Sequence, residues 1–137
     1  MPGQEMRRKS VRYKLVPQET EIRGKVVMLV DDSIVRGTTC KEIIKMVREF
    51  GAHKVYFVTT APPMISPCFY GIDIQHPDEL IANSMSVEEI RHNLGADSLG
   101  YLSLDSLIDA TKLRDSQLCT GCLTRNYPIP VQLEMDK

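Results

Sequence analysis

The alternation of apolar segments between residues 25 and 63 restricts the fold of this chain more than any other feature. The runs 25–32 (KVVMLVDD) and 54–62 (KVYFVTTAP) are strongly apolar, and the segment 38–52 between them (TTCKEIIKMVREFGA) carries apolar side chains at helical spacing. A strand, a helix and a strand within about 35 residues form a βαβ unit, which predicts a parallel α/β sheet. Because residues 26–30 are apolar on both faces, we expect the first strand to be covered on both sides.

The segments beyond residue 63 continue this alternation. We expect a short helix at 76–83 and a helix at 86–96, where Ser86 and Glu89 form a capping box and Gly95 closes the helix. A short strand at 98–103 and a helix at 104–112, capped by Ser103, should follow.

These elements predict three parts of the chain. Residues 1–24 are polar and basic and form a flexible loop and lead-in, residues 25–112 form the α/β core, and residues 113–137 form an irregular tail with two cysteines. Two complete strands and one short strand are few for a stable open sheet, so we expect the chain to be incomplete on its N-terminal side.

Composition excludes several classes of protein. The net charge of -1 gives no general attraction to nucleic acid or membranes. The sequence has neither a run of about 18 apolar residues nor the apolar core of a secretory signal near its start. We therefore expect a cytoplasmic protein, in which Cys40, Cys68, Cys119 and Cys122 are free thiols or metal ligands rather than disulfides.

Two adjacent carboxylates, Asp31 and Asp32, end the first apolar run and are here called the acidic pair. The segment 33–39, SIVRGTT, leads from them into the next helix. Ligands of parallel α/β sheets bind outside the carboxyl ends of the strands, and a small-residue loop before a helix N-terminus suits a phosphate. Two acids would repel a phosphate unless a sugar lay between, with its hydroxyls on the carboxylates. The simpler alternative is an acidic pair that only caps a strand end.

The stretch 26–39, VVMLVDDSIVRGTT, resembles the phosphoribosyl pyrophosphate motif of type I phosphoribosyltransferases. Its form DDSIVRGTT is similar to that of the glutamine phosphoribosylpyrophosphate amidotransferases, and the segments PGQEMRRKSVRYKL, PPMISPCFYGID, SVEEIR and CTGCLTRNYP extend the resemblance over nearly the whole chain. The resemblance implies the C-terminal part of a type I phosphoribosyltransferase domain, with a parallel, Rossmann-like sheet flanked by helices and an irregular cysteine-containing tail.

The family's binding roles transfer to matching positions. The acidic pair would bind the ribose hydroxyls and Mg²⁺, and Arg8 and Lys9 would approach the pyrophosphate when the flexible loop closes. The 5′ phosphate would be surrounded by Ser33, Arg36, Gly37, Thr38 and Thr39. Taken without the resemblance, the basic cluster around Arg8 is better explained by a solvated, mobile arm.

The resemblance implies the first committed step of purine synthesis. Glutamine-derived ammonia attacks C1 of the ribose, pyrophosphate leaves, and purine nucleotides inhibit by feedback; full-length members form homo-oligomers. Residue 2 is Pro and no cysteine precedes Cys40, so the cysteine nucleophile of the family's glutaminase domain is absent. We expect this chain alone neither to hydrolyse glutamine nor to complete the transfer, and we identify no catalytic residue in it.

The cysteines resemble those of the family branch that carries a [4Fe–4S] cluster. Cys68 matches its PCFYGI segment, and Cys119 and Cys122 match its C-x-x-C tail. Cys40 begins a helix and is not expected to be a ligand. We therefore predict that the chain holds three of four ligands, and that a cluster in the isolated chain is absent or unstable. From spacing alone, the C-x-x-C pair could also be a redox pair, half a zinc site or a coincidence.

Two other functions remain open at this stage. One is a different type I phosphoribosyltransferase, which the PGQ…RRKSVR loop and the cysteine tail disfavour. The other is a regulatory protein that senses phosphoribosyl pyrophosphate with a non-catalytic phosphoribosyltransferase fold. Such a regulator would carry a DNA-binding module, and no recognition helix with a basic face is evident in the sequence.

Overall fold

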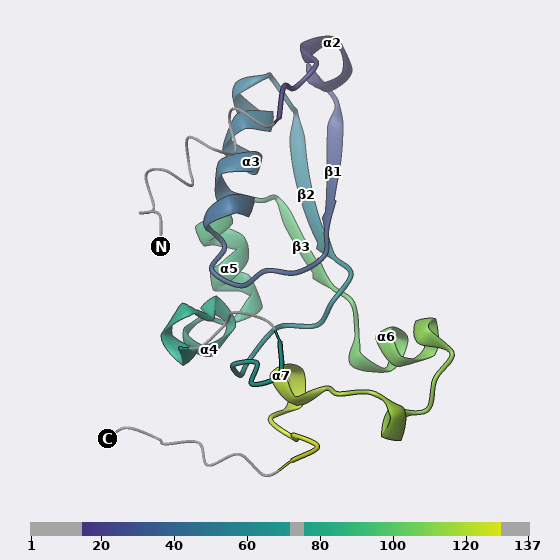
Figure 1. Cartoon of the computed structure of the whole chain (residues 1–137). Coiled ribbons are helices and arrows are strands. Elements are labelled where there is room, and N and C mark those ends of the chain that lie inside the picture. Colours follow the sequence, from purple (N-terminus) through teal and green to yellow (C-terminus); the bar gives the residue numbers. More distant parts are fainter. Residues whose placement is uncertain (1–14, 72–75, 130–137) are drawn as a thin grey trace.

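A computed structural model describes residues 15–71 and 76–129 of the chain (Figure 1). Three parallel strands form one sheet in the order β1–β2–β3: β1 spans Val26–Asp31, β2 spans Lys54–Thr59 and β3 spans Ser98–Tyr101. The pairing joins Asp31 to Thr59 and Thr59 to Tyr101, so all three strands end at the same edge of the sheet. The predicted parallel α/β sheet is confirmed.

Two helices cover one face of this sheet (Figure 1). They are α3, Thr38–Glu49, and α5, Val87–Leu94. Their apolar stripes meet the inward-facing residues of β2 in one core, whose buried members are Ile34, Cys40, Ile44, Val47, Val55, Phe57, Ile90, Leu94 and Ala96. The apolar side chains of α3 and the inward-facing side chains of β2 therefore lie in the same core, and burial of this one face of β2 specifies its register in the sheet.

The opposite face of β1 is exposed in the part of the chain that the structure describes. Val26, Met28 and Val30 keep 53%, 62% and 64% of their surface accessible. The prediction that this strand is covered on both sides is therefore wrong for residues 15–71 and 76–129. An apolar run shows that a strand suits burial on both faces, but only another element can cover the second face.

The helix ends follow their capping residues closely. In α5, the Ser86 side chain accepts a hydrogen bond from the Glu89 N–H, the Glu89 carboxylate accepts one from the Ser86 N–H, and Gly95 closes the helix at a φ of 77°. In α6, Leu104–Thr111, Ser103 accepts a hydrogen bond from the Ser106 N–H. Both predicted caps are confirmed.

Three segments differ from their predictions in detail. The helix expected at 76–83 is divided into η1, Pro77–Glu79, and α4, Ile81–Ser84, because Leu80 between them is extended. The lead-in contains one helical turn, α2, at Glu19–Ile22. The tail is not wholly irregular, since it contains η2 at Asp115–Gln117 and α7 at Gly121–Thr124.

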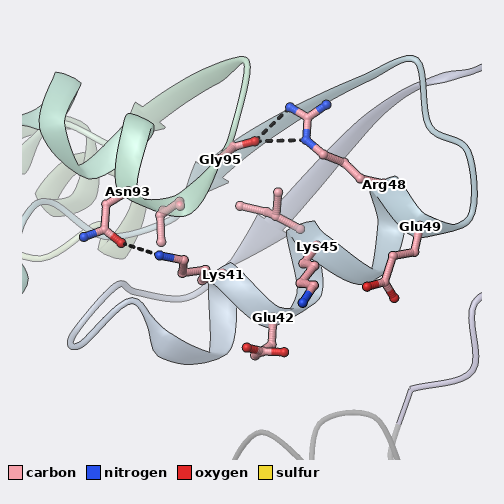
Figure 2. Close-up of a pocket in the computed structure, with 9 residues that line it drawn as sticks. Lys41, Glu42, Lys45, Arg48, Glu49, Asn93 and Gly95 are labelled. Atoms are coloured by element: carbon pink, nitrogen blue, oxygen red, sulfur yellow. Dashed lines mark hydrogen bonds between the residues drawn. The ribbon is translucent and has the colours of Figure 1, made fainter.

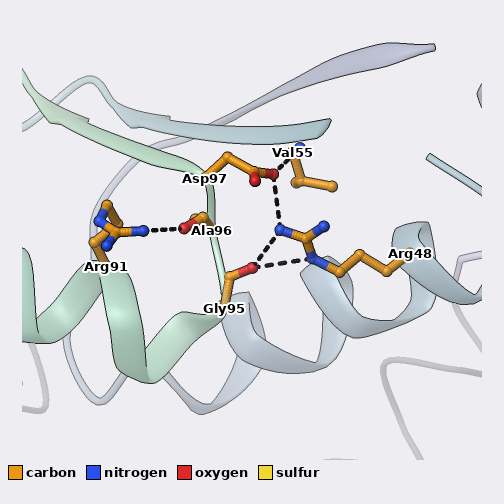
Figure 3. Close-up of polar contacts among 6 residues, drawn as sticks. All are labelled: Arg48, Val55, Arg91, Gly95, Ala96 and Asp97. Atoms are coloured by element: carbon orange, nitrogen blue, oxygen red, sulfur yellow. Dashed lines mark hydrogen bonds and ion pairs between the residues drawn. The ribbon is translucent and has the colours of Figure 1, made fainter. Parts of the chain in front are cut away.

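A polar clamp joins α3 to the connection between α5 and β3, at the amino end of the strands (Figure 3). Arg48 donates to the Gly95 carbonyl oxygen and forms an ion pair with Asp97, whose carboxylate also accepts a hydrogen bond from the Val55 N–H at 2.7 Å. The Val55 hydrogen bond and then Arg48 hold the pKa of Asp97 below its usual value, against the opposing effect of burial. The clamp fixes the helices at the end of the sheet opposite the acidic pair.

Within residues 15–71 and 76–129, none of the helices has both the length and the apolar character that crossing a membrane requires.

Candidate functional site

The acidic pair lies at the carboxyl end of β1. Asp31 is the last residue of the strand, and its backbone carbonyl accepts a hydrogen bond from Thr60 N–H, which ties the end of β1 to the end of β2. The Asp31 carboxylate accepts from the Asp32 N–H at 2.9 Å, and the Ser33 hydroxyl donates to the Asp32 carboxylate at 3.2 Å. Asp31 is half-buried and Asp32 is exposed, so a ligand has free access to carboxylate oxygens here.

Residues 33–39, here called the phosphate loop, run from the acidic pair into α3. Ile34 is 1% exposed and joins the core beneath, so it anchors the loop from below. Helix α3 begins at Thr38 after Gly37, where no side chain caps the helix and its first turn holds no acidic residue. The first N–H groups of an α-helix have no partner within it and carry partial positive charge. The loop therefore presents free donors next to the acidic pair.

Both the backbone conformation at position 37 and the limited space around it require glycine. Its φ of 71° lies in the left-handed region that favours glycine. A Cβ atom at this position would lie 3.1 Å from Ile81 Cδ1 and 3.2 Å from Leu94 Cδ2. The glycine therefore lets the loop pack directly against α4 and α5.

Two buried groups lie behind the acidic pair. Cys40, in the first turn of α3, is 4% exposed, and burial followed by the charge of Asp31 raises the pKa of its thiol to about 12. Burial and then Cys40 raise the pKa of Tyr101 to about 12, and the Tyr101 hydroxyl has no hydrogen-bond partner among the described residues. Both groups stay protonated at neutral pH. The position of Cys40 agrees with its prediction as a residue at a helix start.

The sequence analysis assigned no role at the site to the segment that supports the phosphate loop from the outside. Glu79 forms an ion pair with Arg36, and the Ile81 N–H donates to the Val35 carbonyl oxygen at 2.9 Å. Glu79 and Ile81 lie at least 40 positions after the loop in the sequence, and no local pattern links them to it. The phosphate loop and the segment 79–81 become neighbours only when the chain folds.

The tail and the loop that carry the three predicted cluster ligands meet in space. The Cys122 carbonyl oxygen accepts from the N–H groups of Ile65 and Ser66, at 2.9 and 3.1 Å. Burial, then Cys68 and more weakly Cys119, raise the pKa of Cys122, so these thiols are close enough to influence one another. We call residues 64–70 and 118–129 the cysteine region.

The cysteine region is secured by Tyr127. Its hydroxyl donates to the Pro67 carbonyl oxygen at 2.5 Å and lies 2.7 Å from Ser66 Oγ, while its ring makes edge contacts with Phe69 and Tyr70. None of the four cysteines, all of which the structure describes, forms a disulfide. In the ranges 15–71 and 76–129, no three His, Cys, Asp or Glu side chains are grouped so as to hold one metal ion.

Two of the predicted site residues, Arg8 and Lys9, lie outside the described residues. The predicted residues that the structure describes fall into two groups at the carboxyl end of the sheet. The first group joins the acidic pair to the phosphate loop, with Ser33, Arg36, Gly37, Thr38 and Thr39. The second group is the cysteine region.

A groove of about 630 Å³ also lies between α3 and α5, on the outer side of the helices (Figure 2). Lys41 reaches across it to Asn93, and Lys45 and Arg48 lie further along α3. No residue of the acidic pair or the phosphate loop lines this groove. It is therefore separate from the candidate site.

Comparisons with known proteins identify relatives of this chain. Amidophosphoribosyltransferases from Methanothermobacter thermautotrophicus, Methanocaldococcus jannaschii and Bacillus subtilis are 44%, 48% and 46% identical to the chain over 100%, 98% and 95% of its length. The chain spans only 28–29% of the length of these curated relatives. No family model matches it.

Solved structures support the same relationship. Glutamine phosphoribosylpyrophosphate amidotransferase from Bacillus subtilis, complexed with ADP and GMP, matches 98% of the chain with a TM-score of 0.78 and 40% identity, and the chain covers 30% of it. A structure described as the allosteric regulatory enzyme of purine biosynthesis matches with the same TM-score at 38% identity. The predicted phosphoribosyltransferase fold is confirmed. With this identity over nearly its whole length, the chain belongs to the amidophosphoribosyltransferase family.

Proposed function

We propose that the chain is the part of an amidophosphoribosyltransferase that binds phosphoribosyl pyrophosphate. The observation that carries this proposal is the junction of the acidic pair with the phosphate loop and the uncapped start of α3. Carboxylates suit the ribose hydroxyls, and free N–H groups with the hydroxyls of Ser33, Thr38 and Thr39 suit the 5′ phosphate. One continuous segment therefore offers acceptors for the sugar and donors for the phosphate.

The acidic pair also has the chemistry for Mg²⁺. Hard cations of this kind bind carboxylate oxygens and keep several waters, together with phosphate oxygens of a substrate. Asp32 is exposed and its carboxylate has only the neighbouring Ser33 hydroxyl as a described hydrogen-bond donor. When bound, Mg²⁺ would supply charge neutralisation for the departing pyrophosphate.

In the complete enzyme, the reaction would be displacement of pyrophosphate from C1 of the ribose by glutamine-derived ammonia. The role of the described residues would be to bind and orient the substrate, which lowers the entropic barrier to the displacement. Arg8 and Lys9 would approach the pyrophosphate from outside the described part. The relative solved with ADP and GMP supports the proposal that purine nucleotides regulate the complete enzyme. We also propose that the full-length enzyme is a homo-oligomer.

The cysteine region supplies three side chains of the type that binds a [4Fe–4S] cluster, one fewer than the cluster needs. Cys68, Cys119 and Cys122 come from two segments that are joined by backbone hydrogen bonds. A four-iron cluster is larger than a single ion, so its ligands stand further apart than the ligands of a mononuclear site. The cluster would be structural and would tie the tail to the domain, with a fourth ligand supplied from elsewhere. Iron and sulfide analysis of the purified chain tests whether the fourth ligand is missing from it. A stoichiometric cluster in the isolated chain would contradict that prediction.

Binding of phosphoribosyl pyrophosphate in the presence of Mg²⁺, measured by isothermal titration calorimetry, tests the main proposal. Asp31→Asn and Asp32→Asn should each weaken binding at least about tenfold, since a hydrogen bond to a charged group contributes about 1.5–3 kcal/mol. Asp109→Asn, an exposed change in α6, is the matched control and should bind as the wild type does. Unchanged affinity in both acidic-pair variants would contradict the proposal.

A further inference from the structure

One short segment, residues 79–81, contacts three consecutive residues of the phosphate loop. Glu79 is ion-paired with Arg36, and the Ile81 N–H donates to the Val35 carbonyl oxygen at 2.9 Å. Ile81 also packs so closely against Gly37 that a Cβ there would lie 3.1 Å from its Cδ1 atom. The loop is thus held from outside by an ion pair, a backbone hydrogen bond and a close van der Waals contact.

The ion pair between Arg36 and Glu79 is shielded on both sides. The side chains of Arg36 and Glu79 are 30% and 27% exposed, whereas the helix pairs Arg23–Glu19 and Lys25–Glu21 are more than half exposed on both partners. Charge-assisted hydrogen bonds are stronger when water is partly excluded, and removing one partner leaves the other charge poorly solvated. This pair therefore has more influence on local geometry than a surface pair has.

The arrangement gives Arg36 a different role from the other loop residues. The ion pair with Glu79 compensates the charge of the Arg36 guanidinium, which weakens its attraction for a phosphate. The guanidinium is well suited to hold the loop in place, because it joins the loop to Glu79, the last residue of η1. The donors beside the loop that helix geometry leaves without a backbone partner are instead the N–H groups at the uncapped start of α3.

We propose that Glu79 is a positioning residue that holds Arg36, and that Arg36 acts through the geometry of the phosphate loop and not as a direct ligand of the 5′ phosphate. This inference rests on the proposed function and refines the role that the sequence predicts for Arg36. Glu79 pre-arranges the loop, so that binding does not have to order it.

The alternative is that Arg36 leaves Glu79 to bind the phosphate. The two roles predict opposite effects of Glu79→Gln. If Glu79 positions the loop, its loss weakens binding. If Glu79 competes with the phosphate for Arg36, its loss frees the guanidinium and tightens binding.

The test measures affinity for phosphoribosyl pyrophosphate with Mg²⁺ in Glu79→Gln, Arg36→Met and the double variant. We expect each single variant to bind about tenfold more weakly, and the double variant to be no worse than either one, because both changes break the same contact. Arg36→Lys should recover part of the affinity, since it keeps the charge. Glu88→Gln, which removes the exposed partner of Arg91 on α5, is the matched control and should leave affinity unchanged. Unchanged or tighter binding by Glu79→Gln would overturn the inference.

Amide hydrogen exchange without ligand separates this inference from the proposed function. In Glu79→Gln, the Ile81 amide, which donates to the Val35 carbonyl oxygen, should exchange faster. So should the Lys41 amide, which donates to the Gly37 carbonyl oxygen. The amides of Ile90 and Leu94 in α5 should not change. Unchanged exchange at Ile81 and Lys41 contradicts the positioning role of Glu79. A wild-type chain that binds no phosphoribosyl pyrophosphate contradicts the proposed function, whatever the exchange shows.

Discussion

The phosphate loop and the cysteine region lie at the same end of the sheet but are built differently. The phosphate loop is one continuous segment that joins β1 to α3, so chain connectivity alone brings its donors beside the acidic pair. The cysteine region joins two segments about 50 residues apart, and it depends on Tyr127 and on the hydrogen bonds to the Cys122 carbonyl oxygen.

This difference teaches where each region is vulnerable. A continuous loop keeps its composition in any fold, but its shape depends on the glycine at its turn and on the segment that braces it. A region made of two distant segments no longer brings its side chains together once the two segments separate. We therefore expect single substitutions to change the shape of the phosphate loop and to separate the two halves of the cysteine region.

The largest effect is expected from Gly37→Ala. The left-handed backbone costs a non-glycine residue roughly 1–2 kcal/mol, and the new Cβ would also crowd Ile81 and Leu94. Urea denaturation should show a loss of about 2–4 kcal/mol in the free energy of unfolding, within the range for strain plus overpacking. Binding of phosphoribosyl pyrophosphate should fall below detection.

Gly24→Ala is the matched control for this prediction. Gly24 has a similar φ of 74°, but a Cβ there would have no neighbour within 4 Å. Its cost should be the backbone term alone, about 1–2 kcal/mol, with ligand binding unaffected. Equal losses of stability in the two variants would show that the contact between the phosphate loop and α4 does not restrict the loop.

Gly121→Ala should separate the two halves of the cysteine region. Gly121 is buried against the Tyr127 ring, and a Cβ at this position would overlap the ring directly. The ring must move, so its contacts with Phe69 and with Pro67 are lost. Mass spectrometry should show faster iodoacetamide labelling of Cys122, while buried Cys40 keeps its slow rate.

Tyr127→Phe is a milder version of the same change. It keeps the ring and removes only the hydroxyl that bonds to Pro67, so the free energy of unfolding should fall by about 1 kcal/mol. Cys122 labelling should lie between the wild-type and Gly121→Ala rates. If Tyr127→Phe labels as fast as Gly121→Ala does, the hydroxyl and not the ring holds the tail.

The smallest effect is expected from Asp97→Asn, at the opposite end of the sheet from both regions. The folded-state pKa of Asp97 is below its usual value, so the ionised carboxylate stabilises the fold above about pH 4 and this contribution is lost as the pH falls through the folded-state pKa. The variant should lose less than about 1 kcal/mol at pH 7, because Asp97 is a partly exposed pair partner.

Urea denaturation at pH 7 and pH 3 measures this effect. The difference in stability between the wild type and Asp97→Asn should shrink at pH 3, whereas ligand binding and Cys122 labelling at pH 7 should not change. A change in either readout would mean that the clamp at the amino end of the strands also controls the two regions at the carboxyl end.

Local sequence patterns predicted much of the fold because the signals are short-range. The Ser86 capping box, Ser103 and the glycine at the end of α5 satisfy backbone groups within one helical turn, so their positions alone define the helix ends. The division of the segment 76–83 at Leu80 escaped prediction, because Leu80 is drawn into the core beside Met64 and its backbone becomes extended.

The sequence by itself determined the acidic pair, the phosphate loop and their order along the chain, because a strand, a loop and a helix that follow one another place these groups at one strand end. Only the tertiary structure decided the partners of that loop and of the tail. Glu79 meets Arg36, and Cys122 meets Ile65, through contacts between distant segments. Such contacts depend on how helices pack on the sheet, and no spacing within either segment encodes them. The exposure of one face of β1 has the same physical cause, because burial of an apolar face depends on another element that packs against it.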